Sequence, residues 1–547
     1  MDEQELIAAA HECGLTDVTI AAAVGQRWCA GGVSVEGNWR IAGMSLRIGL
    51  KLPDEFPACR PKVYLLAGAA EQLPHVDASG VICPLENEGT VHDPGRPHQV
   101  VLETLAHARN VLEDGLLGRN RDDFLAEAEA YWVGEDSIVS VVAANDDARE
   151  VVAFLGDRSS LVAVADNESS LHSRLPGIGG RTRRAFYLPL DRKLTLPGDP
   201  RRYACWPSPV LKELTPEANA LLQQMRVHRS QSLVLVFGVP RPSGGRSLLG
   251  VVLEAFSHDD RLLCSRPSSV RRIHLDRFDN DRLLERTSPP HRRLAVIGCG
   301  AIGGHVAHAL AWSGASELVL VDRDGYHGGN TYRHVLGREG WLERSKVSSL
   351  TKQLTRVLPN LSVTPLELTA DAAFAKHEEL LRGCDAIVVA IGNPSAPLCM
   401  NDDLAERRFG VPLVYTWLEP YGVGGHALLV RYGSPGCLRC LFHNEPSFRN
   451  AADFSSPGQN FSKSELGCYG SFTPYGDLDA RETATMAARL VQLVLDDGIA
   501  APQLRSWRGN ARRFREAGFK TSDRYESFHS GTDTQLVPRA GCNACQA

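Results

Sequence analysis

A glycine-rich turn between two apolar segments constrains the fold of this chain more than any other feature. The turn, GCGAIGGHVAHALA beginning at Gly298, follows the apolar segment Leu294–Ile297. It precedes a second apolar segment, Leu318–Val321, which ends at Asp322. Strand, glycine turn, helix and strand in this order predict a nucleotide-binding βαβ unit.

Three glycines of this turn have predicted structural roles. Gly298 and Gly300 let the backbone approach a polyphosphate, and Gly303 lets the helix pack closely on the strand. Asp322, about 20 residues further on, suits a ribose hydroxyl. The motif alone is compatible with a dehydrogenase.

The residues after Asp322 favour ATP over a nicotinamide cofactor. They include a second carboxylate, Asp324, followed by Asn330, Arg333 and Lys346. Hydride transfer has no need of two cations and an amide beyond the ribose acid. A site that cleaves ATP needs cations on the phosphates and carboxylates for Mg²⁺. The sequence therefore predicts ATP and Mg²⁺.

Residues 292 to about 360 resemble the adenylation domain of ubiquitin-activating enzymes and their bacterial ThiF/MoeB-type relatives in thiamine and molybdopterin biosynthesis. The resemblance rests on the glycine loop, the D-x-D, the N-x-x-R and the following lysine, and it continues to the C-terminus. It implies a Rossmann-like adenylation domain. It also implies that Asp322 holds ribose while Asn330, Arg333 and Lys346 hold phosphates.

One position departs from that family. An Asp-Asn pair usually follows the next core strand, here Ala386–Ala390, and its aspartate helps to hold Mg²⁺. In this chain the pair reads Gly392 and Asn393. Metal binding then rests on Asp324, Asn393, Asp385 or the phosphates themselves.

Length and charge limit the classes of protein to consider. At 547 residues the chain is long enough for three domains, and its net charge of −6 argues against a general nucleic-acid or anionic-membrane binder. It has no apolar segment of membrane-spanning length, and it starts with an acidic segment rather than a basic signal peptide. We expect a cytoplasmic protein in which most of the 14 cysteines are thiols, metal ligands or nucleophiles.

We predict three domains in an α/β and α+β arrangement. Residues 1–133 form an α+β domain, 134–287 a connector domain of unknown role, and 288–547 the adenylation domain. Apolar segments such as Ser232–Phe237 and Leu249–Leu253, separated by Gly/Pro-rich turns, indicate that the connector is rich in strands.

The N-terminal domain shows both strand and helix periodicity. Apolar residues alternate at Leu46, Ile48, Leu50 and Leu52, and they share one helix face at Val101, Leu105, Ala108 and Leu112. Between these segments lie LPDEFPACRPKVYL and LPHVDASGVICPLENEG.

This order resembles the core of ubiquitin-conjugating enzymes, in which a P-x-x-[FY]-P-x-x-x-P segment precedes a His-Pro-Asn triplet and G-x-I-C. Here Gly80, Ile82 and Cys83 match the last motif, so the resemblance implies that Cys83 carries a thioester. His75 stands where the family has the asparagine that stabilises the oxyanion. An imidazole can also donate that hydrogen bond.

Two CxxC pairs predict a metal site. Cys437 and Cys440 form the first pair, and Cys542 and Cys545 form the second. Four thiolates with this spacing satisfy a tetrahedral Zn²⁺ and leave no open position, so we expect structural zinc. A redox CxxC is the competing interpretation. The adenylation family often has its zinc in this arrangement.

A further cysteine, Cys468, lies between the two pairs, in ELGCYGS before a helix predicted from about Asp479. In the family, this segment crosses over the nucleotide site and its cysteine accepts the activated acyl group. Cys299, Cys384 and Cys399 are expected in the core.

An activating and a conjugating domain on one chain imply a relay. A protein C-terminal carboxylate would be adenylated, transferred to Cys468, then to Cys83, and finally to an amine. The domain order resembles the fused conjugation enzyme of bacterial CBASS antiphage operons, which implies a cGAS-like nucleotidyltransferase as the partner and a homodimer of activating domains. A sulfur-carrier adenylyltransferase and a non-catalytic nucleotide-binding scaffold are the alternatives.

Overall fold

In the computed structural model the described residues are 1–21, 32–69, 73–77, 79–83, 91–120, 122–123, 129, 132, 136–156, 160–174, 180–191, 210, 214–224, 232–241, 245–253, 256–259, 262–265, 270–277, 291–358, 361–393, 395–443, 448–464, 471–498, 502–529, 532–536 and 541–545. They form two compact units, Met1–Leu171 with Ile178–Arg277 and His172–Gly177 with Phe278–Ala547. The domain boundaries expected at 133/134 and 287/288 lie outside the described residues and stay predictions.

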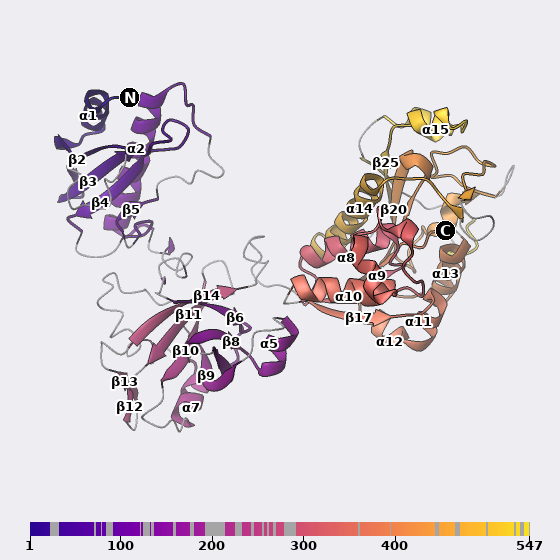
Figure 1. Ribbon diagram of the computed structural model, residues 1–547, viewed down its shortest axis with the longest axis horizontal. Helices are drawn as coiled ribbons and strands as arrows, with labels where there is room; N and C mark the ends of the chain where they lie inside the picture. Colours follow the sequence, from indigo (N-terminus) through magenta and orange to yellow (C-terminus); the bar gives the residue numbers. More distant parts are fainter. Residues whose placement is uncertain are drawn as a thin grey trace. The chain divides into compact units, whose positions relative to one another are not determined.

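The described residues of the N-terminal part include an antiparallel five-stranded sheet and two helices (Figure 1). The sheet has the order β1 (Thr16–Ile20), β2 (Val33–Ile41), β3 (Met44–Leu52), β4 (Lys62–Ala67) and β5 (Val81–Ile82), and the helices are α1 (Glu3–Glu12) and α2 (Pro97–Leu117). The alternating residues of β3 and the apolar face of α2 are buried in one shared core, which confirms both predicted periodicities. Helix α2 begins at a proline and ends before Gly118, whose left-handed conformation stops it.

A closed barrel follows, with the strand order β10-β11-β14-β6-β8-β7-β9. Its strands are β6 (Asp136–Val141), β7 (Arg149–Leu155), β8 (Leu161–Ala165), β9 (Arg181–Pro189), β10 (Leu233–Pro240), β11 (Arg246–Leu253) and β14 (Val270–Arg277). Strands β12 (Phe256–Asp259) and β13 (Leu262–Ser265) form a separate hairpin, and the helices are α5 (Glu168–Arg174) and α7 (Pro216–Gln224). Two described residues that precede β6 contact the barrel: Trp132 Nε1 donates to the carbonyl of Gly250, and the Glu129 carboxylate accepts from the N–H of Leu248. The two strands expected in this region are confirmed as β10 and β11.

The C-terminal part is an eight-stranded sheet between two layers of helices (Figure 1). Its order is β17 (Ser362–Leu366), β16 (Glu317–Val321), β15 (Arg293–Ile297), β18 (Ala386–Val389), β19 (Leu413–Leu418), β20 (Gly424–Val430), β25 (Gln503–Arg508) and β26 (Thr532–Leu536). The first five strands are parallel and the last three antiparallel.

Alternate residues of the parallel strands face opposite helix layers. Leu294 and Val296 of β15 share a core with α8 (Ala301–Trp312), α10 (Lys346–Val357) and α14 (Asp477–Asp496). Ala295 and Ile297 share the other core with α11 (Ala370–Lys376), α12 (Glu378–Arg382) and α13 (Ser395–Glu406). Because β15 pairs with both β16 and β18, the strand order reverses there, and ligands of such sheets bind at the carboxyl ends of these strands.

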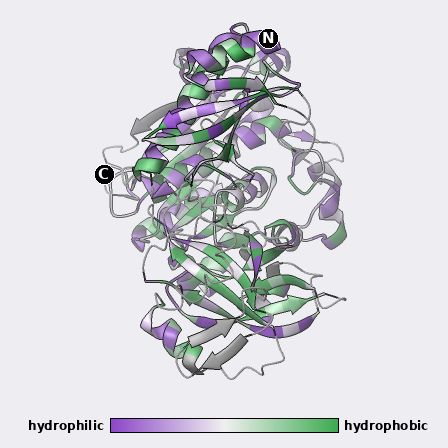
Figure 2. Ribbon diagram, turned by 90° about the vertical axis from the view of Figure 1, so that its left-hand side faces the viewer, coloured by the Kyte–Doolittle hydropathy of each residue, from purple (hydrophilic) through white to green (hydrophobic). Residues whose placement is uncertain are grey.

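The remaining α-helices and strands of the described residues are short. They are α9 (Gly340–Glu343), α15 (Arg512–Glu516), α16 (Asp523–Ser527) and the paired strands β21 (Phe442–His443) with β22 (Arg449–Asn450) and β23 (Lys463–Ser464) with β24 (Ser471–Phe472). Hydrophilic and hydrophobic residues alternate along the helices in Figure 2, as expected for helices that bury one face. None of the described helices has the length and apolar character needed to span a lipid bilayer.

Candidate functional site

The glycine loop connects β15 to α8 at the edge where the parallel strands end. Gly298 has φ +85°, and a Cβ there would lie 2.6 Å from the carbonyl oxygen of Ala390. A Cβ at Gly303 would lie 1.7 Å from the carbonyl oxygen of Gly298, so α8 packs directly on the loop. Gly300 faces open space and precedes α8 without a side-chain cap. The N–H groups of this helix start are therefore suited to an anion.

Asp322 is held against this loop by both carboxylate oxygens. Its Oδ2 accepts a hydrogen bond from the N–H of Cys299 at 2.8 Å, and its Oδ1 accepts from the N–H of Asp324 at 2.8 Å. Each oxygen retains further lone pairs for a hydroxyl group. The geometry is compatible with the ribose role that the resemblance implies.

Lys346 and Asp324 form an ion pair at the same edge. Lys346 begins α10, and its side chain is only 9% exposed, with Nζ 3.3 Å from Asp324 Oδ2. Asp324 is 61% exposed, so the pair has one buried cation and one accessible carboxylate. Such a pair can serve phosphate and Mg²⁺ respectively.

Arg333 contacts the segment that follows the predicted crossover cysteine. Its Nη1 donates to the carbonyl of Thr473 at 3.2 Å, and its guanidinium lies 4.7 Å from the centre of the Tyr475 ring. A guanidinium has five N–H donors, so this contact leaves donors for a phosphate. Asn330 lies one helical turn earlier, where its Oδ1 accepts from the N–H of His327. Sequence patterns had no signal for the link between Arg333 and Thr473.

His334 is a second residue that the sequence did not single out. It is 4% exposed, and its Nε2 lies 2.8 Å from the carbonyl oxygen of Cys299 in the glycine loop. Burial lowers the pKa of His334 to about 4, so the ring is neutral at pH 7 and can donate this bond. The bond fixes the loop that carries Arg333 to the glycine loop.

We expect His334 to make the C-terminal part sensitive to acid. The pKa of about 4 in the folded protein lies below the ordinary histidine pKa of 6.5, so the contribution of His334 to stability is complete above pH 6.5 and is lost as the pH falls toward 4. At pH 5 the loss should be about 2 kcal/mol. Thermal unfolding at pH 7.5 and 5 should show a smaller pH effect in His334→Gln, which cannot titrate. The exposed His443→Gln should behave like the parent, and an equal pH effect in both variants would contradict the assignment.

The candidate Mg²⁺ ligands lie at different edges of the parallel sheet. Asp385 precedes β18, and its Oδ2 accepts from the N–H of Arg293 at the start of β15, so it lies at the opposite edge from the glycine loop. Asn393 follows β18 at the correct edge, where its Oδ1 accepts from the N–H of Ser395. Gly392 faces open space. The geometry thus favours Asp324 and Asn393 over Asp385.

A buried hydrogen-bond network anchors the segment that leads toward Cys468. The Glu419 carboxylate accepts from the N–H groups of Phe454 and Ser455, from the Ser455 hydroxyl and from His426 Nε2. Burial lowers the pKa of His426 to about 3, so its ring is neutral and accepts from the Ser506 hydroxyl. Glu419, His426 and Asp453 lie close enough to hold a metal, but these hydrogen bonds already use both histidine nitrogens.

Cys83 is exposed directly after β5. Its N–H donates to the carbonyl of His75 at 2.8 Å, so the two residues predicted to act together lie side by side. His75 has φ +61°, and its Nε2 lies 3.0 Å from Asp123 Oδ2. The turn between them is closed by Asp77, whose Oδ1 accepts from the N–H groups of residues 79 and 81.

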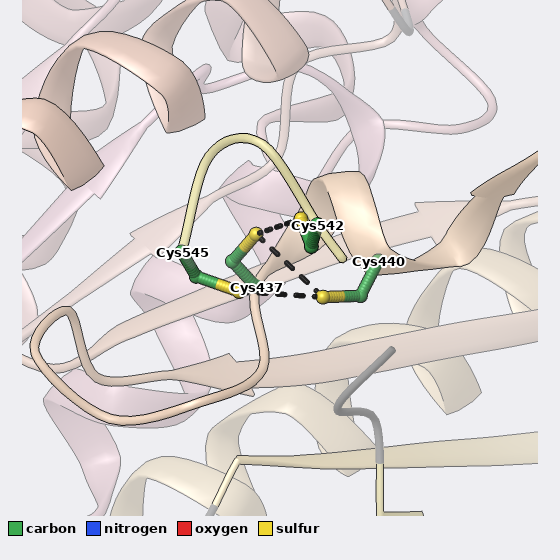
Figure 3. A group of neighbouring side chains, drawn as sticks. All are labelled: Cys437, Cys440, Cys542 and Cys545. Carbon is green, nitrogen blue, oxygen red and sulfur yellow. Dashed lines mark hydrogen bonds between the residues drawn. The ribbon is translucent and has the colours of Figure 1, made fainter. Parts of the chain in front are cut away.

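The four cysteines of the two CxxC pairs come together (Figure 3). Their sulfurs lie within 4.8 Å of one another, and the Sγ–Sγ distances are 3.9 Å for Cys437–Cys440, 3.8 Å for Cys437–Cys542 and 3.5 Å for Cys440–Cys545. Tetrahedral Zn²⁺ with Zn–S bonds of about 2.3 Å requires sulfurs about 3.8 Å apart, whereas a disulfide requires about 2.05 Å. The site could hold zinc. Asn401 Nδ2 also donates to Cys437 Sγ at 3.7 Å, which orients that ligand.

The other cysteines differ in their surroundings. Cys468 lies outside the described residues, and the strands that flank it, β23 and β24, pair with each other. Cys299 and Cys384 are buried as expected, and burial raises the pKa of Cys384 to about 12. The expectation for Cys399 is wrong: it lies on the exposed face of α13, because the helix buries its neighbours Leu398 and Met400 instead.

Comparison with known families identifies two kinds of domain. Residues 275–497 match the ThiF family, and residues 27–140 match prokaryotic E2 family B. The chain therefore joins an E2-type domain to a ThiF-type domain, which confirms the fold classes expected for the two ends of the chain.

Three curated proteins are similar to this chain, two of them over most of its length. The ATP-dependent ubiquitin transferase-like protein Cap2 of Pseudomonas aeruginosa is 25% identical over 486 residues, which cover 84% of this chain and 83% of that protein. Cap2 of Escherichia coli is 21% identical over 78% of this chain and 80% of that protein. The SAMP-activating enzyme E1 of Haloferax volcanii is 28% identical over 35% of this chain and 70% of that protein. At the family level these relatives support ATP-dependent, ubiquitin-like activation.

Proposed function

We propose that this protein activates the C-terminal carboxylate of a partner protein with ATP and then ligates it to an amine. The observation that carries the proposal is the combination of a ThiF-type and an E2-type domain on one chain. Similarity to Cap2 over 84% of the chain supports it. The exposed Cys83 beside His75 supports a thioester step, because a sulfur-carrier adenylyltransferase would have no use for it.

The first step is adenylation of the carboxylate. In this proposal Gly298, Gly300 and Gly303 shape the loop for the phosphates of ATP, and Asp322 binds the ribose. Asn330, Arg333 and Lys346 bind phosphates. Mg²⁺, which would neutralise phosphate charge, would be held by Asp324 and Asn393. The partner's carboxylate oxygen attacks the α-phosphorus, and pyrophosphate leaves.

The next steps move the acyl group between thiols. Cys468 thiolate attacks the acyl adenylate, AMP leaves, and a thioester forms. Cys83 thiolate then takes the acyl group and Cys468 is released as a thiol. Each thioester retains the activation of the carboxylate after the nucleotide has left. An amine, which we propose is a lysine, finally receives the group as an amide.

The partner proposed here is a cGAS-like nucleotidyltransferase in antiphage defence, and the activating domains would form a homodimer. The test is exchange of labelled pyrophosphate into ATP by the full chain with a cGAS-like nucleotidyltransferase as the partner. Exchange should occur with the intact partner and disappear when its last residue is removed. A sulfur-transfer function predicts exchange without a reducible adduct on Cys83, and a scaffold predicts no exchange.

We propose structural Zn²⁺ at Cys437, Cys440, Cys542 and Cys545, and we expect about one metal per chain. Cys542→Ser should release the metal and lower the unfolding temperature of the C-terminal part, because zinc binding contributes directly to folding. Cys399→Ser, at an exposed position, should retain both metal and stability. Metal analysis and thermal unfolding measure the two effects. A metal-free parent protein of normal stability would contradict the assignment.

A further inference from the structure

Asn401 is a buried polar residue that contacts the cysteine cluster. It belongs to α13, it is fully buried, and its Nδ2 donates to Cys437 Sγ at 3.7 Å. We propose that Asn401 is the positioning residue of this cluster and that its hydrogen bond to the Cys437 thiolate determines how tightly the metal is held. This inference rests on the proposed function, because it requires Zn²⁺ at the four cysteines.

The neighbours of Asn401 determine which way its amide points. The backbone N–H of Leu438 can only donate, and its nitrogen lies 3.0 Å from Asn401 Oδ1, so the amide oxygen must face Leu438. The Tyr432 hydroxyl donates to the same oxygen at 3.3 Å. The amide nitrogen therefore faces Cys437 Sγ and Asp402 Oδ1. Both acceptor and both donor positions of the amide are used, so its orientation is fixed.

A second hydroxyl group supports this arrangement. Tyr415 of β19 is buried, and its hydroxyl oxygen lies 2.7 Å from that of Tyr432. Because Tyr432 gives its one hydroxyl proton to Asn401, Tyr415 is the donor between the two hydroxyl groups. Each donor in this series of hydrogen bonds points toward Cys437. This is the direction that a negatively charged sulfur requires, and such a series polarises its last donor.

The Cys437 thiolate needs this donor because the residue is closed to bulk solvent. Four thiolates around Zn²⁺ leave two excess negative charges, and a buried charge is costly unless it is hydrogen-bonded. Cys437 is fully buried and lies beside the sulfurs of Cys440 and Cys542 (Figure 3). Bulk water cannot replace a hydrogen bond that is lost there. The Asn401 N–H therefore offsets charge that would otherwise weaken metal binding.

Helix α13 holds the first cysteine pair through a second contact. Arg439, which lies between Cys437 and Cys440 in the sequence, donates from Nε and Nη2 to the two carboxylate oxygens of Asp402. Asn401 and Asp402 thus hold the CxxC turn through contacts that do not involve the metal. A ligand that is already oriented loses less freedom when it binds a metal, so these contacts favour metal binding.

The experiment uses the full chain, freed of metal in the presence of a phosphine reductant and then reloaded with Zn²⁺ or Co²⁺. Competition with a chromogenic chelator measures the Zn²⁺ affinity. Co²⁺ accepts the same ligands, and the energy of its sulfur-to-metal charge-transfer band reports how firmly the thiolates hold their electrons. Neither measurement needs ATP or a partner protein, so both are independent of adenylation.

Asn401→Asp retains the size of the side chain but presents an acceptor to the sulfur. We expect a Zn²⁺ affinity about 100-fold lower and a Co²⁺ band at lower energy, because a thiolate without a donor gives up an electron more easily. Asn401→Leu removes the donor without adding a charge. It should lower the affinity by about 10-fold and shift the band in the same direction by less. It also keeps the inference testable if the buried charge of Asn401→Asp prevents folding.

Two further variants show whether the effect comes from the donor itself. Tyr432→Phe leaves the Leu438 bond and the Asn401 donor in place, so both effects should be smaller than in Asn401→Leu. Asn510→Asp, the same change at an exposed asparagine, should match the parent protein. A parental affinity and an unshifted band in Asn401→Leu would overturn the inference, as would equal effects in Tyr432→Phe and Asn401→Leu. A parent protein that binds neither metal would contradict the zinc assignment itself.

Discussion

Cys83→Ala is expected to abolish amide formation while adenylation continues. Pyrophosphate exchange should stay at the parental rate, and the partner should accumulate as a thioester on Cys468, because its acceptor has been removed. In Cys468→Ala, adenylate should still form, but neither cysteine should be charged efficiently. Non-reducing and reducing gels with ATP and the partner distinguish these species, since a thioester is cleaved by thiols and an amide is not.

Two further variants test the same thiol. Cys83→Lys should trap the partner as a stable amide at position 83, because an amine there receives the acyl group irreversibly. Cys59→Ala is the matched control, since this thiol belongs to the same domain and is only partly exposed. Normal amide formation by Cys83→Ala would mean that the N-terminal domain serves in docking and that the relay is wrong.

Arg333→Ala should reduce pyrophosphate exchange by about 10²–10³-fold, because a phosphate contact in the transition state is worth several kcal/mol. The structure adds a second expectation. Arg333 also holds the Thr473 carbonyl and the Tyr475 ring, so thioester formation at Cys468 should fall further than adenylation does. Single-turnover assays of the two steps measure the difference.

The Arg333→Lys variant distinguishes the effect of the positive charge from that of the hydrogen bonds and ring contact made by the guanidinium. Arg333→Lys retains the positive charge but loses the planar donors and the ring stacking, so it should recover more of the exchange than of the thioester. The exposed Arg338→Ala should match the parent protein. Tight NAD binding without pyrophosphate exchange would contradict the ATP assignment.

Local patterns predicted the elements that carry the site. The glycine loop required close packing at Gly303, and in the structure a Cβ at this position would lie only 1.7 Å from the carbonyl oxygen of Gly298, so only glycine fits there. The alternation from Leu46 to Leu52 predicted β3, because a strand with one buried face has a period of two. The paired CxxC spacing predicted four sulfurs that meet although 105 residues separate Cys437 from Cys542.

Contacts between distant segments could not be predicted in this way. The bonds from Arg333 to Thr473, from His334 to Cys299 and from His75 to Asp123 join residues 35 to 140 positions apart. They depend on how loops fold over the sheet edges, for which a single sequence has no periodic signal. Closure of the barrel was also missed, because it depends on β6 pairing with β14 across the whole connector.

The cysteine cluster has a consequence for the order in which the protein matures. Cys437 and Cys440 are synthesised 105 residues before their partners, so the cluster cannot close until the ribosome has passed Cys545. By then the glycine loop, the phosphate-binding candidates and Cys468 have all been made. Domains generally fold as units during synthesis. A nascent chain therefore contains the glycine loop and the strands around it before the two cysteine pairs can meet, and translation itself delays completion of the ThiF-type domain.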